Sequence, residues 1–132
     1  MQCLSLVRGY ERRVRLYHER RYAAIHGSPL SMMGMPRGNN KTDDTASRVA
    51  RLEEIERMFD TRVMRAVEQS KLLIGNDLPE ELRRKLTDAI WDSCIEGRNF
   101  NFDYRWLPVG KTNFYERRRE FLNNIAIYAG IS

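Results

Sequence analysis

The stretch LPVGKTNFYERRREFL, residues 107–122, joins a proline–glycine turn to the start of an amphipathic helix. Pro108 and Gly110 interrupt any preceding helix, and apolar side chains at helical spacing follow them. We therefore expect a tight turn and then a helix from about Lys111 to Ala129. The apolar face of this helix comprises Phe114, Phe121, Leu122, Ile125 and Tyr128, and its polar face comprises Thr112, Glu116, Arg119 and Asn123.

A turn followed by such a helix is typical of a helix-turn-helix unit, in which the second helix enters the major groove of DNA. That helix needs an apolar rear and long polar side chains on its first turns. Arg118 falls on the apolar side, so we expect its stem to pack while its guanidinium reaches a phosphate or an acidic neighbour. An alternative interpretation is an amphipathic helix whose arginines form a solvated face. The candidate DNA-binding residues are Lys111, Thr112, Asn113, Tyr115, Glu116, Arg117 and Arg119.

The region before the turn supplies the rest of this unit. In the stretch DLPE, an N-cap Asp77 is followed three residues later by Glu80, so a capping box is expected to start a helix there. Gly97 is expected to end that helix in a left-handed conformation. A short aromatic piece from Asn99 to Leu107 then precedes the turn, and residues 77–132 form one unit. The buried face of the helix comprises Leu82, Leu86, Ala89, Ile90 and Cys94.

Two long helices are expected in residues 1–76. The first starts at Cys3 and has arginines, Arg13 among them, on its outer surface. The second begins after Thr42 or Asp43, which cap it, and runs for about thirty residues to Gly75. Because neither apolar seam is wide enough to be buried alone, we expect the helices to pair as an antiparallel, coiled-coil-like hairpin. The first seam comprises Val7, Tyr10, Val14, Tyr17 and Ala24, and the second comprises Val49, Leu52, Phe59, Val63, Ala66 and Leu73.

Further apolar residues lie off the second seam and leave room for another copy of the chain. The hairpin is therefore expected to mediate homo-oligomerisation. These residues are Ile55, Met58, Met64, Val67, Leu72 and Ile74.

Residues 26–42 contain three glycines and two prolines and have no period, so a long loop is expected. Its Pro36-Arg37-Gly38 resembles half of an AT-hook, in which an arginine enters the minor groove of A/T-rich DNA. A disordered tether, or a methionine-rich docking surface for a partner protein, is an alternative. We treat Arg37, Arg105 and Arg118 as further candidate contacts to DNA or a partner.

The composition of the chain narrows the classes of function. Among its 132 residues, 23 Lys and Arg against 18 Asp and Glu give a net charge of +5, which favours a polyanionic partner and nucleic acid first. No apolar run is long enough to span a membrane, and the early arginines do not suit a secretory signal, so a cytoplasmic protein is expected. The two cysteines and two histidines do not have metal-ligand spacing. Nothing suggests a cofactor, and no catalytic constellation is present, so we do not expect an enzyme.

Several segments resemble a known family. The stretches GMPRG (residues 34–38), DDTA (43–46) and RLEEIE (51–56) are similar to the centre of small phage and prophage late-gene regulators of Gram-positive bacteria, the RinA and ArpU type. Residues 86–130 resemble the sigma-factor-like helix-turn-helix of that family. Gly110 stands where such turns usually have serine, and residues 102–106 are aromatic where a Glu-Ile-Ala stretch is usual. The resemblance implies sequence-specific binding near a late promoter and activation of transcription, with RNA polymerase as a further partner.

These observations predict an all-α protein with a helical hairpin in residues 1–76 and a DNA-binding unit in residues 77–132. The expected function is DNA-binding transcriptional regulation of phage genes in the bacterial host, at the nucleoid. Two alternatives remain: a DNA-packaging protein similar to a small terminase subunit, and a protein-binding inhibitor or anti-defence module.

Overall fold

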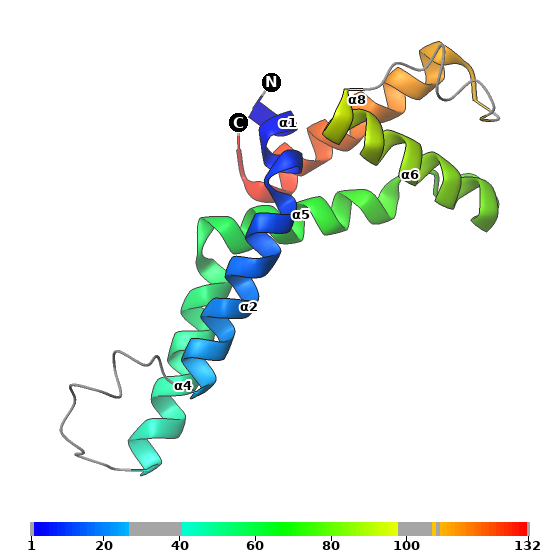
Figure 1. The fold of residues 1–132 in the computed structure, drawn as a ribbon. Helices are drawn as coiled ribbons and strands as arrows, with labels where there is room; N and C mark the ends of the chain where they lie inside the picture. The colour runs from blue at the N-terminus through cyan, green and yellow to red at the C-terminus, as the bar shows by residue number, and fades with distance from the viewer. Residues whose placement is uncertain (1, 27–40, 98–106, 108, 132) are drawn as a thin grey trace. The chain divides into compact units, whose positions relative to one another are not determined.

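The computed structural model describes residues 2–26, 41–97, 107 and 109–131 (Figure 1). In this part of the chain all regular structure is helical, which confirms the predicted all-α class. No described helix is long and apolar enough to cross a membrane. The helices are α1 (Gln2–Arg8), α2 (Tyr10–His26), α4 (Lys41–Arg57), α5 (Phe59–Leu73), α6 (Glu80–Glu96) and α8 (Lys111–Ala129).

The chain divides into two compact units, one of residues 11–62 and one of residues 1–10 together with 63–132. This division differs from the predicted boundary after residue 76. The N-terminal helix α1 belongs with the C-terminal helices, because Leu6 and Val7 are buried in the core that α6 and α8 also form. A short segment far away in sequence thus completes the second unit.

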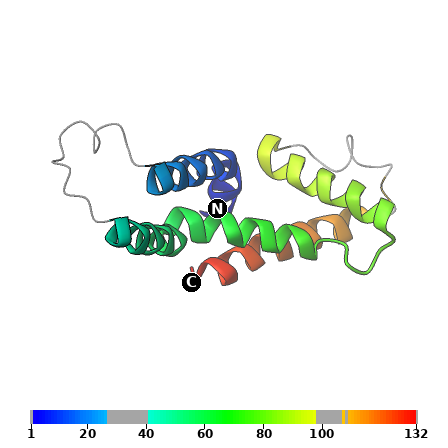
Figure 2. The same cartoon turned by 90° about the horizontal axis from the view of Figure 1, so that it is seen from below.

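In the unit of residues 11–62, α2 and α4 lie side by side and run in opposite directions (Figures 1 and 2). Tyr17, Ala24 and Ile55 are its buried apolar residues. Arg13 was expected on the outer surface but is only 8% exposed. Its Nε donates to the Asp60 carboxylate at 3.1 Å, so the arginine enters the interior with a compensating charge beside it.

The predicted continuous helix of residues 43–74 is interrupted at Met58, where α4 ends and α5 begins. The Met58 N–H donates to the carbonyl of Ile55, three residues back, at 3.1 Å, which is a tighter turn than an α-helix makes. The break changes the helical phase, so apolar residues counted at regular spacing across it no longer share one face. Val49 and Phe59 of the predicted seam are half-exposed, whereas Ile55, outside that seam, is buried. The first predicted helix is similarly divided at Gly9.

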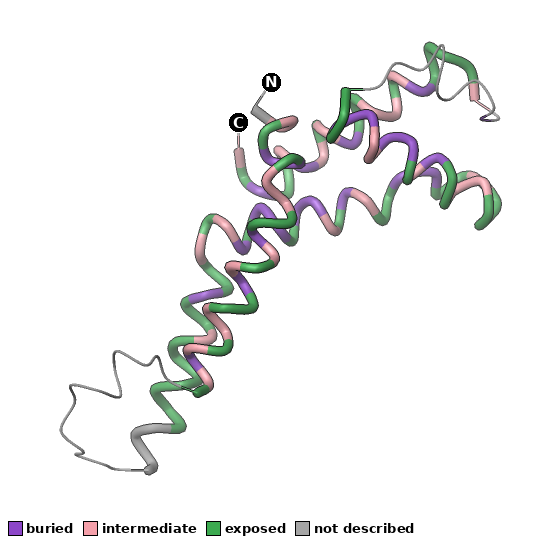
Figure 3. The backbone as a smooth tube through the Cα atoms, viewed as in Figure 1, coloured by how far each residue is buried: buried purple, intermediate pink, exposed green. Residues whose placement is uncertain are grey.

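The second unit has one hydrophobic core, to which α1, α5, α6 and α8 contribute. Buried and exposed positions alternate along these helices (Figure 3). The predicted inner faces of α6 and α8 are largely confirmed, but Tyr128 is 50% exposed and does not belong to the core. The largest fully buried side chains of this core are Val7 of α1, Val63 and Val67 of α5, Leu86, Ile90 and Cys94 of α6, and Phe114, Phe121 and Ile125 of α8.

The helix ends follow the sequence only in part. The predicted N-cap at Thr42 or Asp43 is wrong, because α4 begins at Lys41 and both residues lie inside it. Gly97 has φ of 71° and ends α6 as predicted, since this left-handed conformation strains residues with a side chain. The predicted capping box at the start of α6 is wrong. The helix begins at Glu80 with Pro79 as its N-cap and no side-chain cap, and Asp77 makes a different contact.

Candidate functional site

The first turns of α8 present a polar face outward. Gly110 is the N-cap of this helix, and the Phe114 N–H donates to its carbonyl at 2.9 Å. Phe114 and Phe121 are 0% and 1% exposed, so they hold the rear of the helix in the core. Leu107 is also buried, which anchors the chain three residues before the N-cap of α8. Five of the candidate DNA-binding residues are exposed: Lys111, Thr112, Asn113, Glu116 and Arg119.

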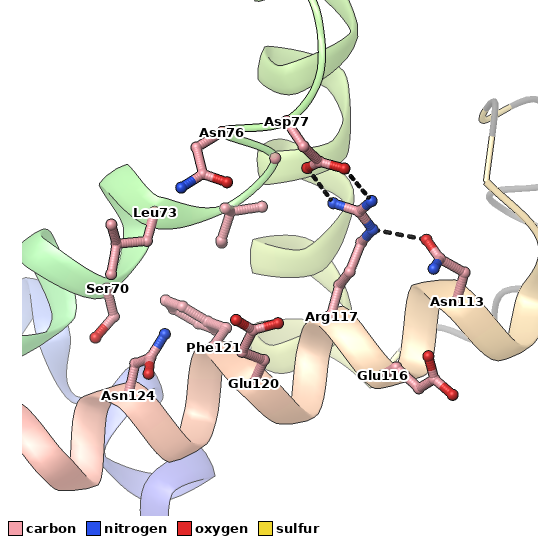
Figure 4. Close-up of a pocket in the computed structure, with 12 residues that line it drawn as sticks. Ser70, Leu73, Asn76, Asp77, Asn113, Glu116, Arg117, Glu120, Phe121 and Asn124 are labelled. Atoms are coloured by element: carbon pink, nitrogen blue, oxygen red, sulfur yellow. Dashed lines mark hydrogen bonds and ion pairs between the residues drawn. The ribbon is translucent and has the colours of Figure 1, made fainter.

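Arg117, another candidate for DNA contact, is engaged within the protein. Its two terminal nitrogens donate to the two carboxylate oxygens of Asp77 at 2.9 and 2.8 Å, and its Nε donates to Asn113 Oδ1 at 2.6 Å (Figure 4). The bidentate geometry is a strong, charge-assisted arrangement. The guanidinium lowers the pKa of Asp77 to about 2, and the carboxylate raises the pKa of Arg117. Arg117 therefore ties α8 to the turn between α5 and α6.

The turn that carries Asp77 is itself held in place. Gly75 has φ of 67°, and the Leu78 N–H donates to its carbonyl at 2.9 Å. Arg83 donates to the carbonyls of Ile74, at 3.1 Å from Nε, and of Leu72. These contacts satisfy carbonyl groups that have no partner inside α5 at its C-terminal end. The local backbone thus positions the Asp77 carboxylate for Arg117.

Two other candidates on α8 lie partly in the interior. Tyr115 is half-buried, and its ring packs edge-on against Phe114 with centroids 5.4 Å apart. The Arg118 guanidinium lies by the Cys94 thiol, and its Nε is buried without a hydrogen bond in the described structure. Burial raises the pKa of Cys94, and the neighbouring Arg118 and Arg8 act in the opposite direction.

Two candidates cannot be placed on this surface, because Arg37 and Arg105 lie outside the described residues. Among the residues that are described, no group of three or more His, Cys, Asp or Glu side chains is placed to hold a metal ion.

A pocket of about 310 Å³ lies between the end of α5, the turn that follows it, and α8 (Figure 4). Asn113, Glu116 and Arg117 line it, so it borders the outward face of α8. Ser70 and Asp77 also line it, although neither was among the candidate residues. The sequence offers no spacing signal for this site, because Asp77 and Arg117 are 40 residues apart.

Replacing Asp77 tests the tie between the turn and α8. Asp77→Asn should lower the melting temperature at pH 7, since the amide cannot accept a bidentate ion pair. The pKa of Asp77 falls from 3.8 to about 2 on folding, so its stabilisation is complete above about pH 4 and is lost as the pH falls toward 2. Melting curves should therefore converge with those of the parent near pH 2. Asp88→Asn, at an exposed position of α6, is the control, and an equal pH-dependent effect there would contradict the assignment.

No protein-family model, curated protein or solved structure gives a significant match to the chain. The interpretation of the site therefore depends on its own geometry and charge.

Proposed function

We propose that the chain is a sequence-specific DNA-binding transcriptional regulator that activates phage late genes, with α8 as its base-reading helix. The observation that carries the proposal is the division of α8 into two faces. Lys111, Thr112, Glu116 and Arg119 are exposed on its first turns, while Phe114 and Phe121 are fully buried behind them. A helix that enters a major groove requires this division, because its rear must be fixed while its side chains reach base edges.

The charges of the molecule support this choice of partner. The chain has a net charge of +5, and Lys111 and Arg119 are exposed cations on the outward face of α8. Cationic side chains gain affinity for DNA by displacing counterions from its phosphates. An exposed Arg119 also has the donor geometry that pairs with guanine in the major groove.

The sequence indicated that Arg117 contacts DNA, but in this proposal it has a different role. Because Asp77 and Asn113 occupy its guanidinium, Arg117 holds the first turns of α8 rather than contacting bases. A recognition helix whose position is already set loses less conformational freedom on binding DNA. Arg117 is accordingly a positioning residue, and the contacting set becomes Lys111, Thr112, Glu116 and Arg119.

The experiment that tests the proposal is capture of fragmented genomic DNA from the encoding organism, followed by sequencing. Enrichment of a site next to a phage late promoter supports the regulator, and transcription with RNA polymerase then tests activation. Enrichment only at a packaging start site would contradict the regulator and favour the alternative function, a DNA-packaging protein. A folded chain that enriches no site would overturn DNA recognition and favour the protein-binding inhibitor.

We further propose that the unit of residues 11–62 contacts a second copy of the chain. Val49 and Phe59 are 50% and 48% exposed, and Tyr22 is 66% exposed, so this unit leaves large apolar side chains in water. Covering them with another copy removes apolar surface from solvent, at about 25 cal/mol per Å². Self-association also fits a DNA-binding regulator, because a dimer places two recognition helices on the two half-sites of an operator.

Light scattering at about 50 μM should give a mass above that of the monomer, because association depends on concentration. The double variant Val49→Ser and Phe59→Ser should shift the protein toward monomer by weakening the apolar contact. Tyr128→Ser, which changes an exposed aromatic in the other unit, should leave the mass unchanged. A parent protein that is monomeric throughout would refute self-association.

A further inference from the structure

Glu116 is an acidic residue on the face of α8 that the proposed function brings against DNA. At about 100° per residue, Thr112, Glu116 and Arg119 fall within an arc of about 60° around the helix axis. Phe114 and Phe121 lie on the opposite side and are fully buried. Glu116 is exposed, as are Thr112 and Arg119. A partner that contacts these two residues therefore meets the Glu116 carboxylate as well.

The Glu116 carboxylate is not engaged by the part of the chain that the structure describes. No ion pair or hydrogen bond joins it to another described residue. Arg119 lies three residues further along α8, at a spacing that permits an ion pair on a helix. In Figure 4 the carboxylate points away from Arg117, whose guanidinium is held by Asp77. The Glu116 oxygens are thus available to accept hydrogen bonds from a partner.

A carboxylate in the major groove discriminates between bases, because it accepts hydrogen bonds and donates none. Guanine presents two acceptors there, and thymine presents an acceptor and a methyl group, so a carboxylate beside either base has no donor to pair with. Adenine has an amino donor, but the N7 acceptor lies beside it. Cytosine presents the N4 amino group as a donor, and this is the base edge with which Glu side chains pair.

The same carboxylate weakens binding to DNA of any sequence, because it brings negative charge toward the phosphates. Lys111 and Arg119 are exposed cations that offset this effect. Attraction to the phosphates therefore comes from these two residues, whereas Glu116 adds repulsion that only a donor on a base edge can compensate. A repulsive element of this kind gives specificity, since it costs more at the wrong site than at the right one.

We propose that Glu116 is the specificity-determining residue of α8 and requires cytosine at one position of the DNA site. The carboxylate accepts from the cytosine N4 amino group and is left unpaired at guanine or thymine. This inference rests on the proposed function, because it needs the outward face of α8 in the major groove. It adds the identity of a base and the residue that selects it.

Selection from a library of short random duplexes, followed by sequencing, tests the inference with the full chain. The parent should enrich a motif that contains one strongly preferred cytosine. Glu116→Gln keeps the length of the side chain but replaces the carboxylate with an amide, which pairs with adenine N6 and N7. In this variant the preferred base at that position should change from cytosine to adenine, and the rest of the motif should stay the same.

Glu120→Gln is the matched control, since Glu120 is exposed on α8 one turn further along. Figure 4 draws its carboxylate beside Phe121 and pointing apart from that of Glu116. Both variants remove one negative charge, so both should bind a duplex without the motif about twofold to threefold more tightly. In fluorescence anisotropy, only Glu116→Gln should reduce the preference for cytosine over thymine, by about fivefold or more.

Both variants should keep the melting temperature of the parent, because both side chains are exposed. Three results would overturn the role of Glu116 while leaving DNA recognition by the chain intact. They are a parent motif whose preferred base pairs are all A·T, a Glu116→Gln motif identical to that of the parent, and an equal loss of cytosine preference in Glu120→Gln. A parent protein that enriches no motif would instead overturn the proposed function itself, so the two failures are distinguishable.

Discussion

Phe121→Ala is expected to lower the free energy of unfolding by about 3–5 kcal/mol. The ring is 1% exposed and packs with Trp91 at a centroid distance of 6.4 Å, so its removal leaves a cavity in the core of the second unit. Phe114→Ala, at a position that is 0% exposed, should cost a similar amount. Losses of this size are a large fraction of the total stability of a small domain.

Chemical denaturation followed by circular dichroism measures both values. Tyr128→Ala on the same helix is the matched control, and because that ring is 50% exposed we expect a loss of about 1 kcal/mol or less. If the two phenylalanine variants unfold like the parent, α8 is rotated differently from the arrangement described above. The assignment of its outward face would then be wrong as well.

Arg119→Ala is expected to weaken binding to the best genomic site by about 1–3 kcal/mol, which corresponds to roughly fivefold to 150-fold. The guanidinium is exposed on the face opposite Phe114 and Phe121, where a groove-reading helix makes base contacts. A contact with guanine would also relax the preference for that base. Loss of a contact with phosphate would instead weaken binding to all DNA sequences alike. It would also reduce the slope of log affinity against log salt concentration by about one.

Fluorescence anisotropy on the captured site and on base-substituted versions distinguishes these contacts. Arg84→Ala removes an exposed arginine from α6 and serves as the control for charge, with little effect expected on base preference. The change of Lys111, Glu116 and Arg119 together to Ala gives the sharper test. A folded triple variant that binds the site as tightly as the parent would refute α8 as the reading helix.

Much of the outward face of α8 could be predicted from its sequence. The spacing of Phe114, Phe121 and Ile125 defines a buried side, and the residues opposite them are exposed as expected. The environments of Arg117 and Tyr115 were more difficult to predict, because both residues lie between the buried and the outward face of the helix. Their environment depends on what packs beside the helix: the turn that carries Asp77 in one case and the hydrophobic core in the other.

The pocket lay beyond sequence reasoning for the same reason. Ser70 is a small polar residue in an amphipathic helix, and nothing near it in sequence marks it as buried without a partner. Glu116 and Glu120 have the spacing of ordinary surface residues on a helix. Only the approach of α5 and the following turn to α8 gives these residues a common environment.

The sequence by itself determined the helical class, the extent of α8 from Lys111 to Ala129, and the glycine end of α6, because these depend on local periodicity and backbone preference. The tertiary structure decided the burial of Arg13 beside Asp60 and the pairing of Asp77 with Arg117 in place of a helix cap. Each of these depends on which distant group comes near. A charged side chain takes the partner that compensates its desolvation best, and that partner need not be close in sequence.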